Sequence, residues 1–258
     1  MLRASRRFAP DEHMLETLPY CGLPPVPGEL LHRFNLDPVL IAVLALLAGA
    51  HIWSVRSRGG RVRATAGWVL ACAALISPLC ALSVSLFSAR VAQHMILVLL
   101  AAPLIASGWT DTRRKSARLW VAAAAFFIAL WFWHMPVPYD ATFTSSTLYW
   151  TMHVTLFGSA VLLWHELLNH RHDRIGDILA AGAVTSMQMG LLGAILTFAT
   201  HPIFLWHLTT SHAWGLTPLH DQQLGGVIMW VPGIALFLWT ALRSLRRAWM
   251  SLERVETV

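Results

Sequence analysis

The sequence predicts an all-α, polytopic membrane protein with seven transmembrane helices, its N-terminus on the outer side and its C-terminus on the inner side. Composition gives the class: 56% of the 258 residues are hydrophobic and 12% are charged. An ordinary soluble domain carries about 25% charged residues. The number and length of apolar segments give the helix count, and the distribution of Lys and Arg gives the orientation.

Seven segments are long and apolar enough to cross a bilayer, which takes about 20 mostly apolar residues. Their approximate bounds are residues 38–55, 65–86, 91–109, 117–135, 148–168, 176–199 and 223–242. Asp37 and Pro38 open the first segment, because Pro is tolerated in a first helical turn. Ser77 and Pro78 interrupt the second, where we expect a kink. A short stretch at 203–214 is expected to lie along the membrane interface.

Positive charge sets the orientation of these helices. Five Lys and Arg fall on one side (Arg3, Arg6, Arg7, Arg33 and Arg90). Fourteen fall on the other (Arg56, Arg58, Arg61, Arg63, Arg113, Arg114, Lys115, Arg118, Arg171, Arg174, Arg243, Arg246, Arg247 and Arg254). Cytoplasmic loops carry the positive excess. The chain therefore divides into an outer N-terminal tail (1–36), a seven-helix transmembrane domain (37–243) and a cytoplasmic tail (244–258).

The three cysteines are not expected to form a disulfide framework. Cys72 and Cys80 lie in one apolar segment, and Cys21 lies in the N-terminal tail. Free cysteines pack well as small apolar side chains, so Cys72 and Cys80 are interpreted as buried core residues.

Several classes of protein are excluded. The net charge of +6 is accounted for by cytoplasmic loops, so nucleic acid is not an expected partner. A retinal photoreceptor needs a lysine inside the bundle, and the single lysine, Lys115, is in a predicted cytoplasmic loop. No phosphate-binding glycine loop, nucleophile elbow or His-Glu-x-x-His zinc motif is present. We expect a protein that is not an enzyme.

Histidines next to methionines give the best indication of function. The pairs are His94-Met95, His134-Met135 and Met152-His153, each near the end of an apolar run. Antiparallel helices place His94, His134 and His153 at similar depth on the outer side. Ionisable residues inside membrane helices usually face the bundle interior. Imidazole binds copper, and thioether sulfur favours Cu(I), so the three histidines predict a copper site.

Other residues are candidates for additional metal ligands or for orienting the ligating histidines. Additional ligands are His201, His220, Met95, Met135 and Met152, although adjacent helical residues point about 100° apart and the methionines are equally compatible with core packing. Asp140 and Asp221 either orient a ligating histidine or cap a helix or turn.

Two further groups are assigned other roles. His165, His170 and His172 are expected at the cytoplasmic interface, too far along the bundle to join the copper site. The glycine pairs at 190 and 193 and at 225 and 226 are expected to allow close helix approach.

The order and spacing of several motifs resemble the bacterial CtaG family of Caa-type cytochrome c oxidase assembly factors, the multi-span membrane kind. The resemblance spans about Phe34 to Trp239 and rests on Ser77-Pro78-Leu79, Ala92-Gln93-His94-Met95, Ala102-Pro103-Leu104, Trp133-His134-Met135-Pro136, Tyr139-Asp140, Trp150-Thr151-Met152-His153, Asp221-Gln222-Gln223-Leu224-Gly225-Gly226 and Met229-Trp230-Val231-Pro232-Gly233. It carries over to His94, His134, His153, Asp140 and Asp221.

The resemblance implies a multi-pass protein of the bacterial cytoplasmic (inner) membrane that assists maturation of heme-copper oxidases through copper supply. The expected partners are oxidase subunits, membrane lipid and a periplasmic copper chaperone, and the expected cofactor is copper as Cu(I). Two alternatives remain open. One is a heme-binding redox membrane protein whose facing histidines are axial ligands. The other is a metal-free oxidase-associated chaperone or subunit.

Overall fold

Every regular element of the described chain is helical. The computed structural model describes residues 18–109, 116–168 and 175–256, and only the backbone at 116–117, 244 and 247–256; these ranges contain no strand. The all-α class predicted from the sequence is therefore confirmed. The predicted charged loops at 110–115 and 169–174, with His170 and His172, lie outside the described residues.

The predicted apolar segments correspond closely to the observed helices. The elements that form the length of the bundle are α2 (Pro38–Ser54), α3 (Arg58–Ile76), α5 (Phe87–Met95), the π-helical η2 (Ile96–Ala101), α6 (Ala102–Ala106), α7 (Ser116–Trp133), α9 (Ser146–Leu168), α10 (Ile175–Thr197) and α12 (Pro218–Glu256). The other elements are the short helices η1 (Pro27–His32), α4 (Leu79–Ser85), α8 (Pro136–Ala141), α11 (His207–Thr210) and η4 (Ser211–Trp214). The last long helix continues to Glu256, so the segment predicted as a C-terminal tail is mostly helical.

Length and composition identify three of the described helices as candidate membrane spans. These are Phe87–Ala106, Ile175–Thr197 and Pro218–Arg243. Counting α3 and α4 as one span gives a fourth, bent by 47° at the break. The break falls at Ser77 and Pro78, so the kink predicted there is confirmed. Seven spans and their orientation stay predictions.

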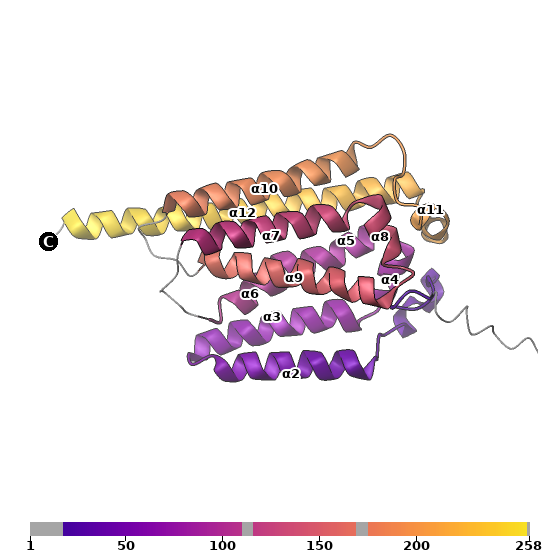
Figure 1. The fold of residues 1–258 in the computed structure, drawn as a ribbon, viewed down its shortest axis with the longest axis horizontal. Coiled ribbons are helices and arrows are strands. Elements are labelled where there is room, and N and C mark those ends of the chain that lie inside the picture. The colour runs from indigo at the N-terminus through magenta and orange to yellow at the C-terminus, as the bar shows by residue number, and fades with distance from the viewer. Residues whose placement is uncertain (1–17, 110–115, 169–174, 257–258) are drawn as a thin grey trace, which may run out of the picture.

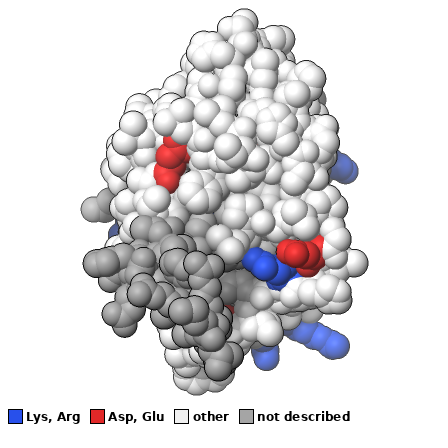
Figure 2. All heavy atoms as spheres, turned by 90° about the vertical axis from the view of Figure 1, so that its right-hand side faces the viewer, with Lys and Arg blue, Asp and Glu red and all other residues white. Residues whose placement is uncertain are grey.

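The long helices lie roughly side by side in one bundle (Figure 1). α10 and α12 run together along one edge, α2 and α3 lie along the other, and α5, α7 and α9 lie between them. The short helices α4, α8 and α11 gather at one end together with residues 18–36, and the C-terminus lies at the opposite end. In the view of the end with the short helices, blue and red charged side chains are few among the white, uncharged residues (Figure 2).

Side-chain caps fix where two of these helices begin. The Asp37 carboxylate accepts a hydrogen bond from the Val39 amide at 2.8 Å, with Pro38 in the first turn, as the sequence predicted. α5 has no cap from its own N-cap residue, Leu86. The Asp221 carboxylate from α12 accepts from the amide of Phe87 at 2.7 Å instead. The first turn of the helix that carries His94 is therefore capped by a residue distant in sequence.

Glycines bring α10 and α12 into close contact, as predicted. A Cβ added at Gly226 would lie 2.6 Å from the Gly193 carbonyl oxygen and 2.4 Å from the Thr197 hydroxyl. A Cβ at Gly193 would lie 3.0 Å from the Gly226 carbonyl oxygen. Backbone contact at this distance leaves no space for a side chain.

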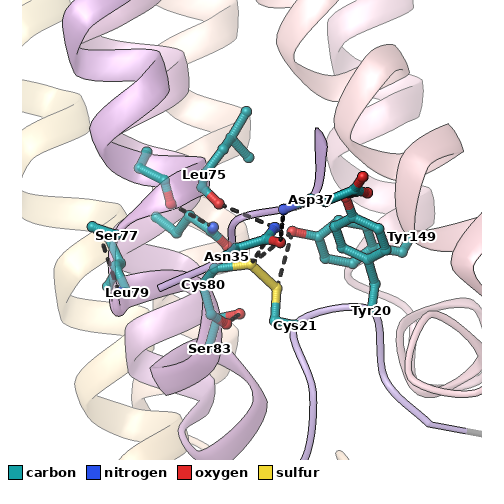
Figure 3. The surroundings of a disulfide bond; sticks show 12 residues. Tyr20, Cys21, Asn35, Asp37, Leu75, Ser77, Leu79, Cys80, Ser83 and Tyr149 are labelled. Carbon is teal, nitrogen blue, oxygen red and sulfur yellow. Dashed lines mark hydrogen bonds between the residues drawn. A yellow bond between two sulfur atoms is a disulfide. The ribbon is translucent and has the colours of Figure 1, made fainter. Parts of the chain in front are cut away.

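The cysteine prediction was wrong in one respect. Cys21 and Cys80 form a disulfide with a Cα–Cα distance of 5.6 Å, which is within the usual range (Figure 3). Cys80 lies at the kink after Pro78, at the same end of the bundle as the N-terminal segment. Spacing within the apolar run did not reveal that the partner of Cys80 is 59 residues away. Cys72 is a free cysteine of intermediate exposure.

Candidate metal site

Three different helical segments supply the predicted histidines. His94 is the last residue but one of α5, directly before the π-helical turn η2. His134 follows the last residue of α7, and His153 lies two turns into α9. π-helical turns occur often at functional sites, because they redirect a side chain within a helix.

The structure brings these three histidines together. The ring centroids of His94 and His134 are 6.0 Å apart, and those of His94 and His153 are 5.3 Å apart. All three side chains are buried, with exposed fractions of 1%, 4% and 4%. His94 is therefore the centre of the cluster, and its two neighbours face it from α7 and α9.

Hydrogen bonds orient the rings of His134 and His153, which flank His94. The Nδ1 atom of His134 lies 2.7 Å from the Leu130 carbonyl oxygen. The Nδ1 atom of His153 lies 3.0 Å from the Tyr149 carbonyl oxygen. A carbonyl only accepts, so each Nδ1 carries the proton and each Nε2 keeps its lone pair. This is the tautomer in which a histidine ligates a metal through Nε2.

Three buried nitrogen atoms of the cluster have no hydrogen-bond partner. They are both ring nitrogens of His94 and the Nε2 atom of His153. A buried polar atom without a partner costs about 1–3 kcal/mol and calls for a physical explanation. A neutral imidazole has one nitrogen with a free lone pair, so a bound cation that accepts one lone pair from His94 and one from His153 Nε2 is an explanation that the donor set fits.

The described residues contain no group of three or more His, Cys, Asp or Glu side chains already placed to hold a metal ion. The plane of the His94 ring is inclined by 77° to that of His134 and by 73° to that of His153. Binding a metal at this cluster thus requires rotation of the rings toward one another.

The methionines divide between the core and the surface. Met95 and Met152 are buried in the main apolar core, with exposed fractions of 5% and 0%. Met135 is 51% exposed. Met95 and Met152 therefore occupy core-packing positions, one of the two roles expected from the sequence.

The remaining candidate ligands differ from the cluster in their exposure. His201 and His220 are exposed, whereas the three clustered histidines are buried. His201 has the Thr200 hydroxyl 3.3 Å from its Nδ1 atom.

Asp140 and Asp221 act on the backbone. Asp140 accepts from the amides of Leu205 and Trp206 at 3.1 and 3.3 Å, which fixes the segment before α11. Burial raises the pKa of Asp140. Asp221 accepts from Phe87 and from the Ser88 amide at 3.0 Å. Of the two interpretations drawn from the sequence, these contacts match capping.

Arg90 was counted among the charges of the outer side, but it is buried in α5, four residues before His94. Its exposed fraction is 1%. The guanidinium donates to the Thr142 hydroxyl at 2.6 Å and lies 3.9 Å from the centre of the Phe143 ring. The i, i+4 spacing of Arg90 and His94 is the sequence signal that could have placed both residues on the same face of one helix.

His207, in α11, is buried beside Tyr139 and Phe143, the two rings that face Arg90. Its Nε2 atom lies 2.8 Å from the Tyr139 hydroxyl, and its exposed fraction is 2%. Burial lowers the pKa of His207 to about 3, with a smaller contribution from the positive charge of Arg90.

The histidines expected at the inner face are also more buried than predicted. His165 has an exposed fraction of 3%, so its predicted interfacial position is corrected to a buried one. His51 is buried as well and receives a hydrogen bond at its Nδ1 atom from the Trp68 indole at 3.0 Å. The Trp109 ring lies between these two histidines, with centroids 4.2 Å from His51 and 6.0 Å from His165.

Comparison with known proteins gives one match. The family described as cytochrome c oxidase caa3 assembly factor (Caa3_CtaG) matches residues 40–251, which include the whole histidine cluster. No curated protein and no solved structure matches the chain significantly.

Proposed function

Because the chain belongs to the cytochrome c oxidase caa3 assembly factor family, we propose that it assists oxidase assembly by binding copper, as Cu(I), and passing it to an oxidase subunit. The histidine cluster of His94, His134 and His153 is the proposed site. The protein acts as a carrier of copper and catalyses no reaction. The resemblance seen in the sequence and the family match agree on the assembly role.

The observation that carries the copper proposal is the convergence of three histidines from α5, α7 and α9. His94 lies between the other two, and three of the cluster's buried nitrogens have no partner. Neutral imidazole is a good copper ligand. A site that needs a small rotation of its rings before it closes also suits a protein that must release its metal.

The proposed setting is the bacterial cytoplasmic membrane, crossed seven times, with the histidine cluster toward the outer face. Two observations support it. The seven apolar segments correspond to the long helical elements, and the C-terminus lies at the opposite end of the bundle from residues 18–36. Copper would arrive from a periplasmic chaperone and leave to an oxidase subunit, within surrounding lipid.

Copper stoichiometry tests the proposal. The full chain is purified in detergent, loaded anaerobically with Cu(I) and analysed for bound metal. We expect copper on the wild type and its loss in the triple variant His94→Ala, His134→Ala, His153→Ala. The matched control is the double variant His201→Ala, His220→Ala, which removes exposed histidines and should keep its copper.

Two outcomes contradict the proposal. Equal copper on the wild type and the triple variant removes the proposed site, and copper on neither of them points to a metal-free oxidase-associated chaperone. A Soret band in the protein from heme-replete cells, lost in the triple variant, assigns the histidines to heme instead.

A further inference from the structure

An apolar groove leads to the buried histidines. It has a volume of about 1240 Å³ and lies among α2, α7 and α9, and His153 is one of the residues that line it. Tyr20 and Asp37 also line it, and Asp37 directly precedes α2, at the same end of the bundle as the N-terminal segment. The cluster itself is almost inaccessible, so a ligand needs an opening, and the groove offers one beside Tyr20.

Three contacts hold Tyr20 in the lining of this groove. Its hydroxyl donates to the Asp37 carboxylate. Its ring stacks on Tyr149 at a centroid distance of 4.8 Å and meets the edge of Trp150 at 5.0 Å. Tyr149 in turn lies with its ring 4.2 Å from that of His153. One aromatic stack therefore connects the N-terminal segment to a histidine of the cluster.

The disulfide holds Tyr20 in place from the neighbouring residue. Cys21 is joined to Cys80 of α4, and the two sulfur atoms lie 3.4 and 3.6 Å from the Tyr149 hydroxyl. Figure 3 shows Tyr20 and Tyr149 stacked beside the sulfur atoms. Gly22 donates from its amide to the Pro19 carbonyl at 2.8 Å, so Tyr20 and Cys21 form the corner of a turn.

Within the segment, Arg33 donates to the Leu23 carbonyl at 2.9 Å. The other hydrogen bonds that join the segment to the bundle begin at Pro25. The Pro25 carbonyl accepts from Ser85 at 2.9 Å and from Trp214 at 3.1 Å. The Asn35 amide donates to the Ile76 carbonyl at 2.8 Å. These contacts leave the turn at 19–22 dependent on the disulfide and on the contacts of Tyr20. Without the disulfide, that turn is free to swing away while residues 25–36 stay attached.

We propose that the Cys21–Cys80 disulfide is a thiol–disulfide exchange site that controls access to His153, and that its partner is a dithiol protein at the outer face. Cys21 is partly exposed and Cys80 is fully buried, so attack occurs at the sulfur of Cys21. Reduction releases the turn that carries Tyr20 and widens the groove beside His153. Oxidation returns Tyr20 to the position that narrows it.

The exchange balances as two substitutions at sulfur. A thiolate of the partner attacks the Cys21 sulfur, the Cys21–Cys80 bond breaks, and Cys80 leaves as a thiolate that takes up a proton. The second thiolate of the partner then attacks the partner's own sulfur in the mixed disulfide and releases Cys21 as a thiolate, which is protonated in turn. Two electrons pass to this chain, and the partner dithiol becomes a disulfide.

Chemical modification of His153 tests the inference without any metal. The purified full chain, oxidised or reduced with dithiothreitol, is treated with diethyl pyrocarbonate, and the modification of each histidine is followed by peptide mass spectrometry. The Nε2 atom of His153 has no hydrogen-bond partner and is the reactive atom. We expect its modification rate to rise roughly tenfold or more on reduction, because a local opening becomes easier. Exposed His220 serves as the internal reference and should not change.

Variants distinguish control of access by Tyr20 and the disulfide from a general loss of stability. Cys21→Ser with Cys80→Ser should react at the fast rate under both conditions. Tyr20→Ala should react fast even with the disulfide intact, and Cys72→Ser should behave as the wild type. Equal His153 rates in the oxidised and reduced wild type overturn the inference. A disulfide that dithiothreitol reduces only in unfolded protein overturns it as well.

The result is distinguishable from the copper proposal. If copper is the cargo, its transfer to a chelator should be faster from reduced protein, with the stoichiometry unchanged. A protein that binds no copper but shows redox-dependent modification of His153 retains the gate and contradicts only the copper proposal.

Discussion

The rings of His94 and His153 lie 5.3 Å apart, and three of their four ring nitrogens are buried without hydrogen-bond partners. The fourth, Nδ1 of His153, lies within hydrogen-bond distance of the carbonyl of Tyr149, one turn earlier in α9. A folded protein rarely leaves so many polar atoms unpaired in so small a volume, because each costs free energy. The pair is therefore the observation on which the proposed copper site rests.

His94→Ala should weaken copper binding more than loss of either neighbour, because His94 faces both His134 and His153. We expect a loss of at least about 100-fold, since even residues that only orient a ligand contribute 10- to 100-fold. Competition with a Cu(I) chelator measures the affinity. Equal effects of His94→Ala and the exposed control His220→Ala would argue against a central role.

Arg90→Met should strengthen copper binding by about tenfold, because it removes a buried positive charge that repels a cation bound nearby. Arg90→Lys keeps the charge and should leave the affinity near that of the wild type. The same chelator competition measures both, in variants with unchanged helix content. If the two variants have the same affinity, the charge of Arg90 plays no part.

Asp221→Ala should lower the free energy of unfolding by about 2 kcal/mol, because the amides of Phe87 and Ser88 lose their buried acceptor at the start of α5. Thermal unfolding in detergent measures the change. The control is Glu29→Gln, which alters an exposed acid and should have no effect. An unfolding midpoint unchanged by Asp221→Ala would show that the cap is dispensable.

Gly226→Ala should lower the free energy of unfolding by about 1–3 kcal/mol, because the added Cβ meets the backbone of α10 at 2.6 Å. Gly182→Ala is the matched control: no atom lies within 4 Å of its added Cβ. That change should leave the stability the same or raise it by up to about 1 kcal/mol, through helix propensity. Equal results for the two glycines would contradict the close approach of α10 and α12.

Acid should destabilise the protein in part through His207. Its pKa falls from 6.5 to about 3 on folding because the ring is buried. The unfolded chain therefore binds more protons than the folded one between these values. The contribution of His207 is complete above pH 6.5 and is lost as the pH falls toward 3, with a slope of up to about 1.4 kcal/mol per pH unit. Unfolding measured from pH 7.5 to 4.5 should show a smaller slope in His207→Gln, and an identical slope would exclude this contribution.

The helices were predictable because their physical cause is local. Twenty apolar residues in a row bury their backbone polar groups only as a helix, and this requirement placed α2, α7, α9 and α10 to within a few residues. Pro78 removes a backbone donor and clashes with the preceding turn, so the kink after α3 was equally visible. The sequence also predicted that the three histidines lie at one depth.

The tertiary structure decided what depends on residues far apart in the chain. Asp221 caps a helix that begins 134 residues earlier, and Cys80 pairs with Cys21 in a segment with no apolar pattern. Arg90 looks like a loop charge by composition, yet rings from α8 and the residues after it enclose it. The helical class and the residues of the candidate site follow from the pattern of apolar segments and histidines along the chain. Only packing determined that His94 faces both of its partners, because the rotation of each helix about its axis is set by its neighbours.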